Sequence, residues 1–110
     1  MDVFSALADP TRRKIIELLA DGGQLPAAEI AAHFPISAPA ISQHLKVLQQ
    51  AGLVSVERRA QQRIYRLNPQ AMLELEDWAR RLRNLWNERF DALEILLEQE
   101  MRKEQQHEQE

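Results

Sequence analysis

Through the first fifty residues, hydrophobic side chains recur at the three- and four-residue spacing of amphipathic helices, and turn-forming residues separate the runs. Asp2 is placed to cap a short first helix. Asp9 can cap a second helix, because the proline that follows it fits the first helical position, where no N–H needs a partner. Gly22 and Gly23 predict the end of that helix. Its apolar positions are Ile15, Ile16, Leu18 and Leu19.

Two further helices are predicted on either side of a proline-containing turn. Pro26 opens the third helix, and Pro35 forces a turn because the residue before a proline avoids the α region. Ser37 is then placed to cap the fourth helix. On this fourth helix the apolar and polar positions fall on opposite sides. The apolar side consists of Ile41, Leu45 and Leu48, and the polar side consists of Pro39, Gln43, Lys46 and Gln50.

A β-hairpin is predicted after the fourth helix, which Gly52 ends. Residues 53–57 alternate with a period of two, and residues 63–67 form a second strand candidate. The loop at residues 60–62 lacks the Asn-Gly or Asp-Gly pair of a tight turn. We therefore expect a connection longer than two residues.

One long helix is predicted from Asn68, its N-cap, and Pro69 to about Glu104, because no helix breaker interrupts this segment. At 1.5 Å per residue its length is about 54 Å, which is more than the width of the domain that residues 1–67 can form. Its apolar stripe cannot be buried within one chain, which favours a symmetric dimer. The tail at 105–110 has no apolar residue, and we expect it to be disordered. The stripe consists of Met72, Leu75, Ala79, Leu82, Trp86, Phe90, Leu93 and Leu97.

Composition restricts the class of protein. A chain of 110 residues with 45% hydrophobic residues fits one domain, assigned to residues 1–97, that includes the dimerisation helix at 69–104. The chain has no cysteine, which excludes disulfides and thiolate metal sites. It shows no signal peptide and no long apolar run, so we expect a cytoplasmic protein without a membrane partner.

The net charge of −3 would by itself argue against a nucleic-acid partner, but the charge is unevenly distributed. Residues 1–67 hold eight basic and six acidic side chains, which gives +2. Residues 68–110 hold six basic and eleven acidic side chains, which gives −5. The acidity therefore belongs to the long helix and the tail, and residues 57–66 carry a local +3.

These elements predict a mainly α fold with a small β-hairpin wing, a winged helix-turn-helix, in the order α-α-α-α-β-β-α. Small residues at the start of the fourth helix allow a close approach to the DNA major groove, and the wing arginines suit contacts with the DNA backbone. The alternative for any single helix is a solvated face, but the basic hairpin beside it favours DNA. The predicted DNA-binding residues are Ser37, Ala38, Pro39, Ala40, Ser42, Gln43, Lys46, Arg58, Arg59 and Arg63.

Arg12, Arg13 and Lys14 lie near the start of the second helix, where the helix dipole disfavours cations. Phosphate is one possible partner. Local pairing of Arg13 with Glu17, together with a contact from Asp9, is the other.

Three segments resemble the arsenical-resistance-regulator (ArsR/SmtB) family of bacterial repressors, namely residues 4–19, residues 36–48 with Ser42-x-His44-Leu45, and Ala51-Gly52-Leu53-Val54. The resemblance covers about residues 2–97. It implies a homodimeric repressor that reads double-stranded operator DNA through the helix beginning at Ser37 and dimerises through its terminal helices. The corresponding interface residues are Val3, Phe4, Leu7, Leu75, Trp78, Leu82, Trp86, Phe90, Leu93 and Leu97.

The sequence departs from the metal-sensing members of this family. The cysteines of their thiolate site are missing, and the long helix offers Asp91, Glu94 and Glu98 but no histidine before His107. It resembles the metal-independent autorepressor branch instead, so no metal or cofactor is expected. A small-molecule pocket between the long helices is left open, although nothing in the sequence points to an effector. The alternatives are a metal-responsive repressor that uses carboxylate and histidine ligands on the C-terminal helix and a winged-helix protein-interaction module. No catalytic constellation or phosphate loop is present, and we predict that the protein is not an enzyme.

Overall fold

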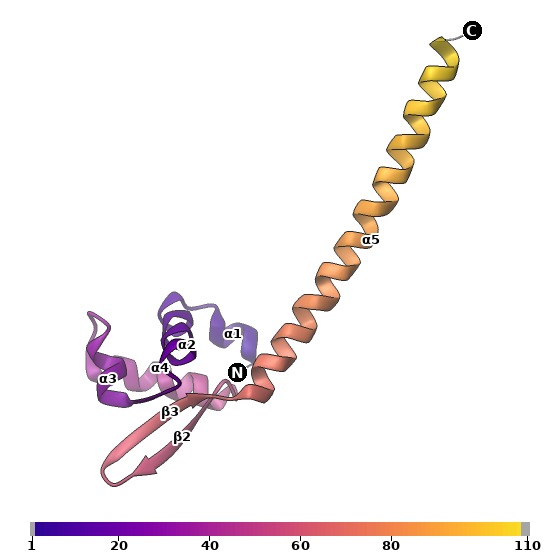
Figure 1. Ribbon diagram of the computed structural model, residues 1–110. Coiled ribbons are helices and arrows are strands. Elements are labelled where there is room, and N and C mark those ends of the chain that lie inside the picture. The colour runs from indigo at the N-terminus through magenta and orange to yellow at the C-terminus, as the bar shows by residue number, and fades with distance from the viewer. Residues whose placement is uncertain (1, 109–110) are drawn as a thin grey trace. The chain divides into compact units, whose positions relative to one another are not determined.

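The computed structural model describes residues 2–108, which form the five predicted helices and, in place of the two predicted strands, three strands (Figure 1). By the distribution of internal contacts the chain forms two units, one up to Leu73 and one from Glu74 on. The elements are α1 (Val3–Leu7), α2 (Pro10–Gly22), β1 (Gln24–Pro26), α3 (Ala27–Ala32), α4 (Ala38–Gln50), β2 (Val54–Arg59), β3 (Gln62–Leu67) and α5 (Pro69–Glu108).

The predicted N-caps of α1 and α2 are confirmed. The Asp2 carboxylate accepts the N–H of Ser5 at 2.8 Å, and the Asp9 carboxylate accepts the N–H groups of Thr11 and Arg12 at 2.8 and 3.1 Å. Because these bonds favour the ionised acids, the pKa of Asp2 is lowered, mainly by the Ser5 N–H. The pKa of Asp9 is also lowered, by the N–H of Arg12 first and that of Thr11 next.

Helix α4 begins at Ser37, whose hydroxyl accepts the N–H of Ala40 at 3.2 Å. It ends in a motif with two reversed bonds, in which the N–H of Leu53 reaches the carbonyl of Leu48 and that of Gly52 reaches Gln49, both at 3.0 Å. Gly52 has φ +79°, the left-handed conformation that this motif requires. The predicted helix end at Gly52 is therefore confirmed and has a physical cause.

The sheet has the order β1-β3-β2, with both pairs antiparallel. Strand β1 was absent from the predicted element order, which placed only a hairpin here. It pairs with β3 through Leu25 opposite Tyr65, and Pro26 lies opposite Ile64. A proline is tolerated in this strand because β1 is an edge strand.

The hairpin loop is shorter than the sequence predicts. Arg59 pairs with Gln62, which leaves a two-residue loop of Ala60 and Gln61. Ala60 adopts φ +52°, so an alanine takes the left-handed conformation that asparagine or glycine usually supplies. The expectation of a longer connection is wrong because tertiary pairing imposes this conformation on a residue that disfavours it.

The core of the first unit lies between α2, α3, α4 and the sheet. The predicted apolar side of α4 is confirmed, since all three of its residues are at most 1% exposed. The largest fully buried side chains are Ile15, Leu19, Ile30, Ile41, Leu45, Leu48 and Leu53. This core fixes the rotation of α4 and directs its polar side outward.

Helix α5 begins after Asn68, whose side-chain oxygen accepts the N–H of Gln70 at 3.1 Å and whose amide donates to the carbonyl of Gly52 at 2.9 Å. The helix continues to Glu108, which is farther than predicted. Residues 105–108 are therefore helical, not a disordered tail, because glutamine and glutamate are good helix formers and no breaker precedes them. The rest of the predicted tail, residues 109–110, lies outside the described residues.

Candidate nucleic-acid interface

The outward side of α4 carries most of the side chains predicted to contact DNA. Ser37, Ala38, Pro39, Ser42, Gln43 and Lys46 are exposed, and Ala40 is half-buried. Gln43 and Lys46 are the long polar side chains among them, while the residues nearer the helix start are small. A helix of this form can approach a groove closely at its N-terminal end and extend two hydrogen-bonding side chains from its middle.

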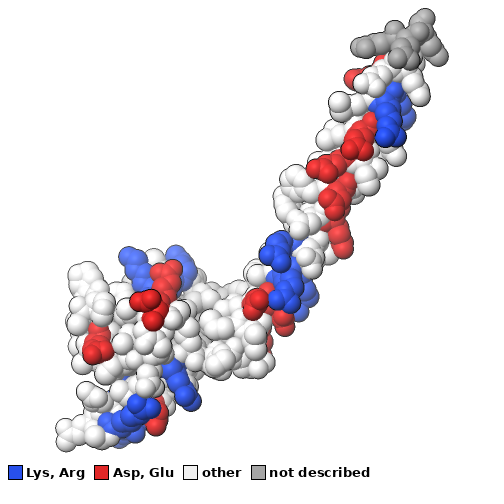
Figure 2. Space-filling view, viewed as in Figure 1, with Lys and Arg blue, Asp and Glu red and all other residues white. Residues whose placement is uncertain are grey.

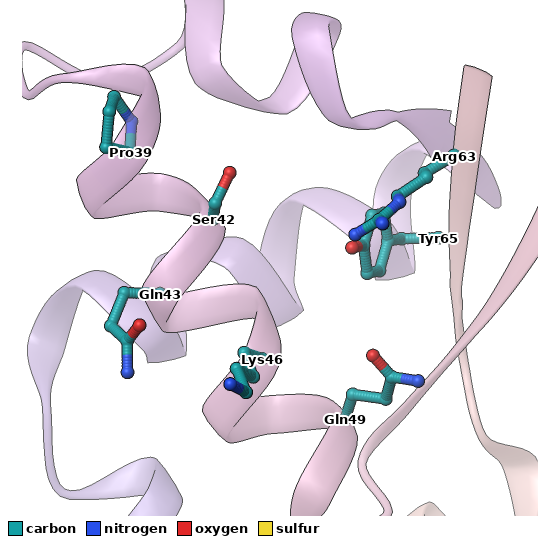
Figure 3. Close-up of a pocket in the computed structure, with 7 residues that line it drawn as sticks. All are labelled: Pro39, Ser42, Gln43, Lys46, Gln49, Arg63 and Tyr65. Carbon is teal, nitrogen blue, oxygen red and sulfur yellow. The ribbon is translucent and has the colours of Figure 1, made fainter. Parts of the chain in front are cut away.

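A hollow of about 450 Å³ separates α4 from β3 (Figure 3). Arg63 and Tyr65 extend from β3 toward the helix in this view, and Lys46 lies on α4 between Gln43 and Gln49. The complete lining is Pro39, Ser42, Gln43, Lys46, Gln49, Arg63 and Tyr65. The structure thus brings four of the predicted α4 residues together with one predicted wing residue.

Two of these lining residues, Gln49 and Tyr65, were not among the predicted site residues. Signals for both exist in the sequence. Gln49 lies three residues after Lys46, on the same helix face, and Tyr65 lies two residues after Arg63, on the same strand face. The spacing of Arg63 and Tyr65 could not be used, because it indicates a shared face only when the hairpin register is known, and the loop sequence does not predict that register.

Arg58 and Arg63 lie directly opposite each other on β2 and β3. Side chains of directly opposed residues project from the same face of a sheet, so Arg58 shares the face of Arg63 and Tyr65. Neither arginine has an acidic partner among the described residues. Two like charges placed opposite each other destabilise a hairpin, and a polyanion would relieve that repulsion. Lys and Arg side chains gather near the tip of the hairpin (Figure 2).

Arg59 and Arg66 belong to the opposite face of the hairpin, because the side chains of neighbouring residues in a strand alternate. Arg59 forms an ion pair with Glu57 at 3.1 Å and reaches the side-chain oxygen of Gln24 at 3.5 Å. Arg66 donates from Nε to the hydroxyl of Ser55 at 3.2 Å. The structure therefore does not bring Arg59, predicted as a DNA contact, to the face that carries Arg58 and Arg63.

The paired arginines of α2 cap the preceding helix. Arg13 donates to the carbonyls of Leu7 and Ala8 at 2.8 and 3.0 Å. Arg12 donates from Nε to the carbonyl of Ala6 at 2.6 Å and from Nη2 to that of Ser5 at 3.3 Å. Cations are favourable at a helix C-terminus, where unpaired carbonyls collect. Of the local alternative that the sequence left open, the contact from Asp9 is present, because its carboxylate accepts the main-chain N–H of Arg12, whereas the ion pairs of the described residues do not include Arg13 with Glu17.

Helix α5 presents a wide stripe of exposed hydrophobic side chains. Leu82 is 52% exposed and Trp86 is 60% exposed, and the ring of Trp86 meets that of Phe90 edge to face, with their centroids 5.3 Å apart. Of the predicted interface residues, Phe4, Trp78, Leu82, Trp86, Phe90, Leu93 and Leu97 are exposed, and Val3, Leu7 and Leu75 are half-buried. Leu85, Leu96 and Met101 extend the same stripe and were not predicted. Surfaces of this kind mark association sites.

Within residues 2–108, no three histidine, aspartate or glutamate side chains are grouped in a way that could hold a metal ion. No helix in that part of the chain combines the length and apolarity needed to cross a bilayer.

Comparison with known proteins agrees with this geometry. The sequence profile described as "Bacterial regulatory protein, arsR family" matches residues 9–56. The chain is 47% identical over 77 residues to the transcriptional repressor SdpR of Bacillus subtilis, a match that covers 70% of this chain and 84% of SdpR.

Two solved structures are also similar. The crystal structure of a possible transcriptional regulator for arsenical resistance superimposes with a TM-score of 0.68 at 41% identity, over 74% of this chain and 84% of that one. The solution structure of the homodimeric winged helix-turn-helix DNA-binding domain of Mb0332 from Mycobacterium bovis superimposes with a TM-score of 0.61 at 27% identity, over 74% and 75%.

The fold and the exposed face of α4 define a winged helix-turn-helix transcriptional regulator. Within this class, the chain belongs to the arsR family of bacterial regulatory proteins.

Proposed function

We propose that the protein is a homodimeric transcriptional repressor that binds an inverted-repeat DNA operator. Each protomer inserts α4 into the major groove of one half-site, and the half-sites lie about one helical turn apart. The α4 side chains of Gln43 and Lys46 contact base edges and phosphates. Arg58 and Arg63 hold the flanking phosphate backbone.

The observation that carries this proposal is the placement of Arg63 beside the exposed face of α4. Arg63 and Lys46 line one hollow, and Arg58 projects from the same face of the wing as Arg63. Three cations without acidic partners thus gather on one side of a protein whose net charge is −3. Such a local group of cations suits phosphates, because neutralised phosphates release their counterions. A protein-binding winged helix has no need for it.

Dimerisation is supported by the exposed stripe of α5 and by the relatives. A solvent-exposed run that includes Leu82, Trp86 and Phe90 favours a partner that covers it, and a two-fold axis brings two identical stripes together. The Mb0332 domain is described as homodimeric. Repression, as opposed to activation, is supported by the name of SdpR as a transcriptional repressor.

The experiment begins with selection of a preferred duplex from a random pool, followed by fluorescence anisotropy on that duplex and on a scrambled one. We expect tighter binding to the selected duplex by 10³-fold or more, roughly the lower limit for specific regulators, and an affinity that falls steeply with salt. Affinity without salt dependence, or without preference for the selected duplex, would contradict the proposal. That result would favour a protein-interaction module instead.

Two variants separate sequence reading from backbone attraction. Gln43→Ala should reduce discrimination between duplexes, because Gln43 is placed to contact base edges. Arg63→Ala should weaken binding to all duplexes alike and lower the slope of log K against log salt by about one. Arg59→Ala is the matched control, because Arg59 already pairs with Glu57 on the other face of the wing. Equal effects of the first two variants on both properties would refute this division of roles.

A further inference from the structure

Arg12, which belongs to α2, connects two other helices, α1 and α4. Its guanidinium donates to carbonyls at the end of α1, from Nε to Ala6 at 2.6 Å and from Nη2 to Ser5 at 3.3 Å. The third nitrogen, Nη1, lies 3.3 Å from Nδ1 of His44, in the middle of α4. One side chain of α2 therefore reaches both α1 and the helix that carries Gln43 and Lys46.

The chemistry of this contact fixes the role of each partner. A guanidinium only donates hydrogen bonds, so in this contact Nδ1 of His44 is the acceptor. The rigid planar fork of arginine directs its three nitrogens at once, which the single ammonium of lysine cannot do. The main-chain N–H of Arg12 is itself held by the carboxylate of Asp9 at 3.1 Å. The residue is thus anchored at both its backbone and its side chain.

We propose that Arg12 is a positioning residue for DNA binding, because it fixes the recognition helix α4 relative to the N-terminal helix α1. This inference rests on the proposed homodimeric function and on the expectation from the sequence that Val3, Phe4 and Leu7 of α1 belong to the dimer interface. Helix α1 has only five residues, too few to be stable alone, so its place depends on contacts of this kind. In the dimer, the position of α4 relative to α1 sets the distance between the two recognition helices.

Binding to both half-sites of an operator depends on that distance, whereas binding to one half-site does not. Two recognition helices must enter major grooves about 34 Å apart at the same time. A protomer whose α4 can shift relative to α1 still reads a single half-site. It loses the advantage of binding two half-sites together, because that advantage depends on matched geometry.

The chain offers a matched control for this idea in Arg13. Arg13 also caps α1, through the carbonyls of Leu7 and Ala8 at 2.8 and 3.0 Å, and within residues 2–108 none of its hydrogen bonds reaches α4. Arg12→Lys and Arg13→Lys each keep the charge and lose the planar fork. Because both bonds of Arg13 come from Nη1 alone, Arg13→Lys should lower the midpoint of urea unfolding no more than Arg12→Lys does. Only Arg12→Lys should alter the relation between α1 and α4.

The test measures Kd by fluorescence anisotropy on a duplex with both half-sites and on a duplex with one. For Arg12→Lys we expect the two-site affinity to fall about tenfold, the size of a typical coupling between sites, and the one-site affinity to change less than about twofold. Arg13→Lys should leave the ratio of the two Kd values as it is in the parent protein. His44→Leu removes only the acceptor and should reproduce the effect of Arg12→Lys. His44→Asn, whose oxygen can accept near the place of Nδ1, should largely restore the ratio.

The outcomes distinguish this inference from the proposed function. If the parent protein binds both duplexes equally, the homodimeric function and this inference fall together. If the parent prefers two half-sites and the Arg12 and His44 variants retain that preference, only this inference is overturned. Equal changes in Arg12→Lys and Arg13→Lys would also overturn it, because they would assign both arginines to α1 alone. If Arg12→Lys does not fold, the two His44 variants decide the question.

Discussion

The two units of this chain solve the problem of hydrophobic burial in opposite ways. In the unit up to Leu73, apolar side chains of α2, α3, α4 and the sheet close a core, and seven large ones are less than 2% exposed. From Glu74 on, no described residue is buried, although ten large hydrophobic side chains of α5 are exposed. The first unit buries its apolar side chains against one another, whereas α5 requires a second surface to bury its apolar stripe.

The polar side chains of the two units also form different kinds of contact. In the first unit, polar side chains bond to main-chain groups near helix ends, such as Asp9 to the start of α2 and Asn68 to the carbonyl of Gly52. Helix α5 carries local ion pairs such as that of Arg80 with Glu76 at 2.9 Å. Pairs spaced by four residues stabilise a helix by only about 0.2–0.5 kcal/mol each. They add modestly to the stability of α5, whose large apolar side chains remain exposed.

The largest expected effect would come from the core of the first unit. Leu45→Ala removes a fully buried side chain from α4 and leaves a cavity, which should lower the free energy of unfolding by about 2–5 kcal/mol. Urea unfolding followed by circular dichroism measures this loss. The loss should be largely independent of protein concentration if the core belongs to one chain. A loss that grew on dilution would show that the first unit also depends on dimerisation.

Because α5 buries no side chain of its own from Glu74 to Glu108, substitutions in its apolar stripe should affect dimerisation. Trp86→Ala should weaken dimerisation by about 2 kcal/mol or more, because a large aromatic residue at the centre of an interface is a typical hot spot. Sedimentation equilibrium measures this change. The matched control is Ile95→Ala, because Ile95 lies nine residues away and therefore on the opposite side of the helix, at similar exposure. Equal weakening by both variants would contradict the interface assigned to the stripe.

Acid should destabilise the first unit through its caps. The pKa of Asp9 is lower in the folded chain than in the unfolded chain, where it is about 3.9, so the ionised form stabilises the fold. This stabilisation is present above the unfolded pKa and is lost as the pH falls through the lowered folded pKa. Asp9→Ala should cost about 1 kcal/mol at pH 7, a typical value for an N-cap. Asp9→Asn keeps the acceptor and should flatten the acid limb of stability against pH.

Urea unfolding at pH 7 and at pH values between 2 and 5 checks both variants. Helix α5 provides the internal reference, because its start is capped by an amide of Asn68 that does not titrate. An acid limb of the same steepness in Asp9→Asn and in the parent protein would show that other carboxylates carry the acid sensitivity.

Elements with local signals could be predicted from the sequence. The caps at Asp2, Asp9 and Ser37 and the left-handed Gly52 act within a few residues, so residue type and spacing are enough. The apolar side of α4 follows from helical periodicity for the same reason. The same periodicity predicts the exposed polar side of α4, which carries the candidate site, because it consists of the positions that the apolar side does not use.

Features that depend on distant pairing could not be predicted. Strand β1 has only three residues and exists because β3 pairs with it across nearly forty residues of sequence. The separation of Arg58 from Arg59 onto different faces depends on the hairpin register, which the loop sequence does not reveal. The contacts of Arg12 were equally hidden, because spacing does not determine which carbonyl or ring a long side chain reaches.

The smallest expected effect concerns the hairpin loop. It tests whether strand pairing in the first unit overrides the conformational preference of a single loop residue. Ala60 is held at φ +52°, which costs a residue with a Cβ roughly 1 kcal/mol, whereas glycine adopts it freely. Ala60→Gly should therefore stabilise the protein by about 0.5 kcal/mol, after the added entropy of the unfolded chain is subtracted. Ala51→Gly is the matched control, because Ala51 has φ −78° and should lose about 0.5–1 kcal/mol. A loss at both positions in urea unfolding would mean that the loop is not strained, and that the two-residue connection reflects the preference of its own residues.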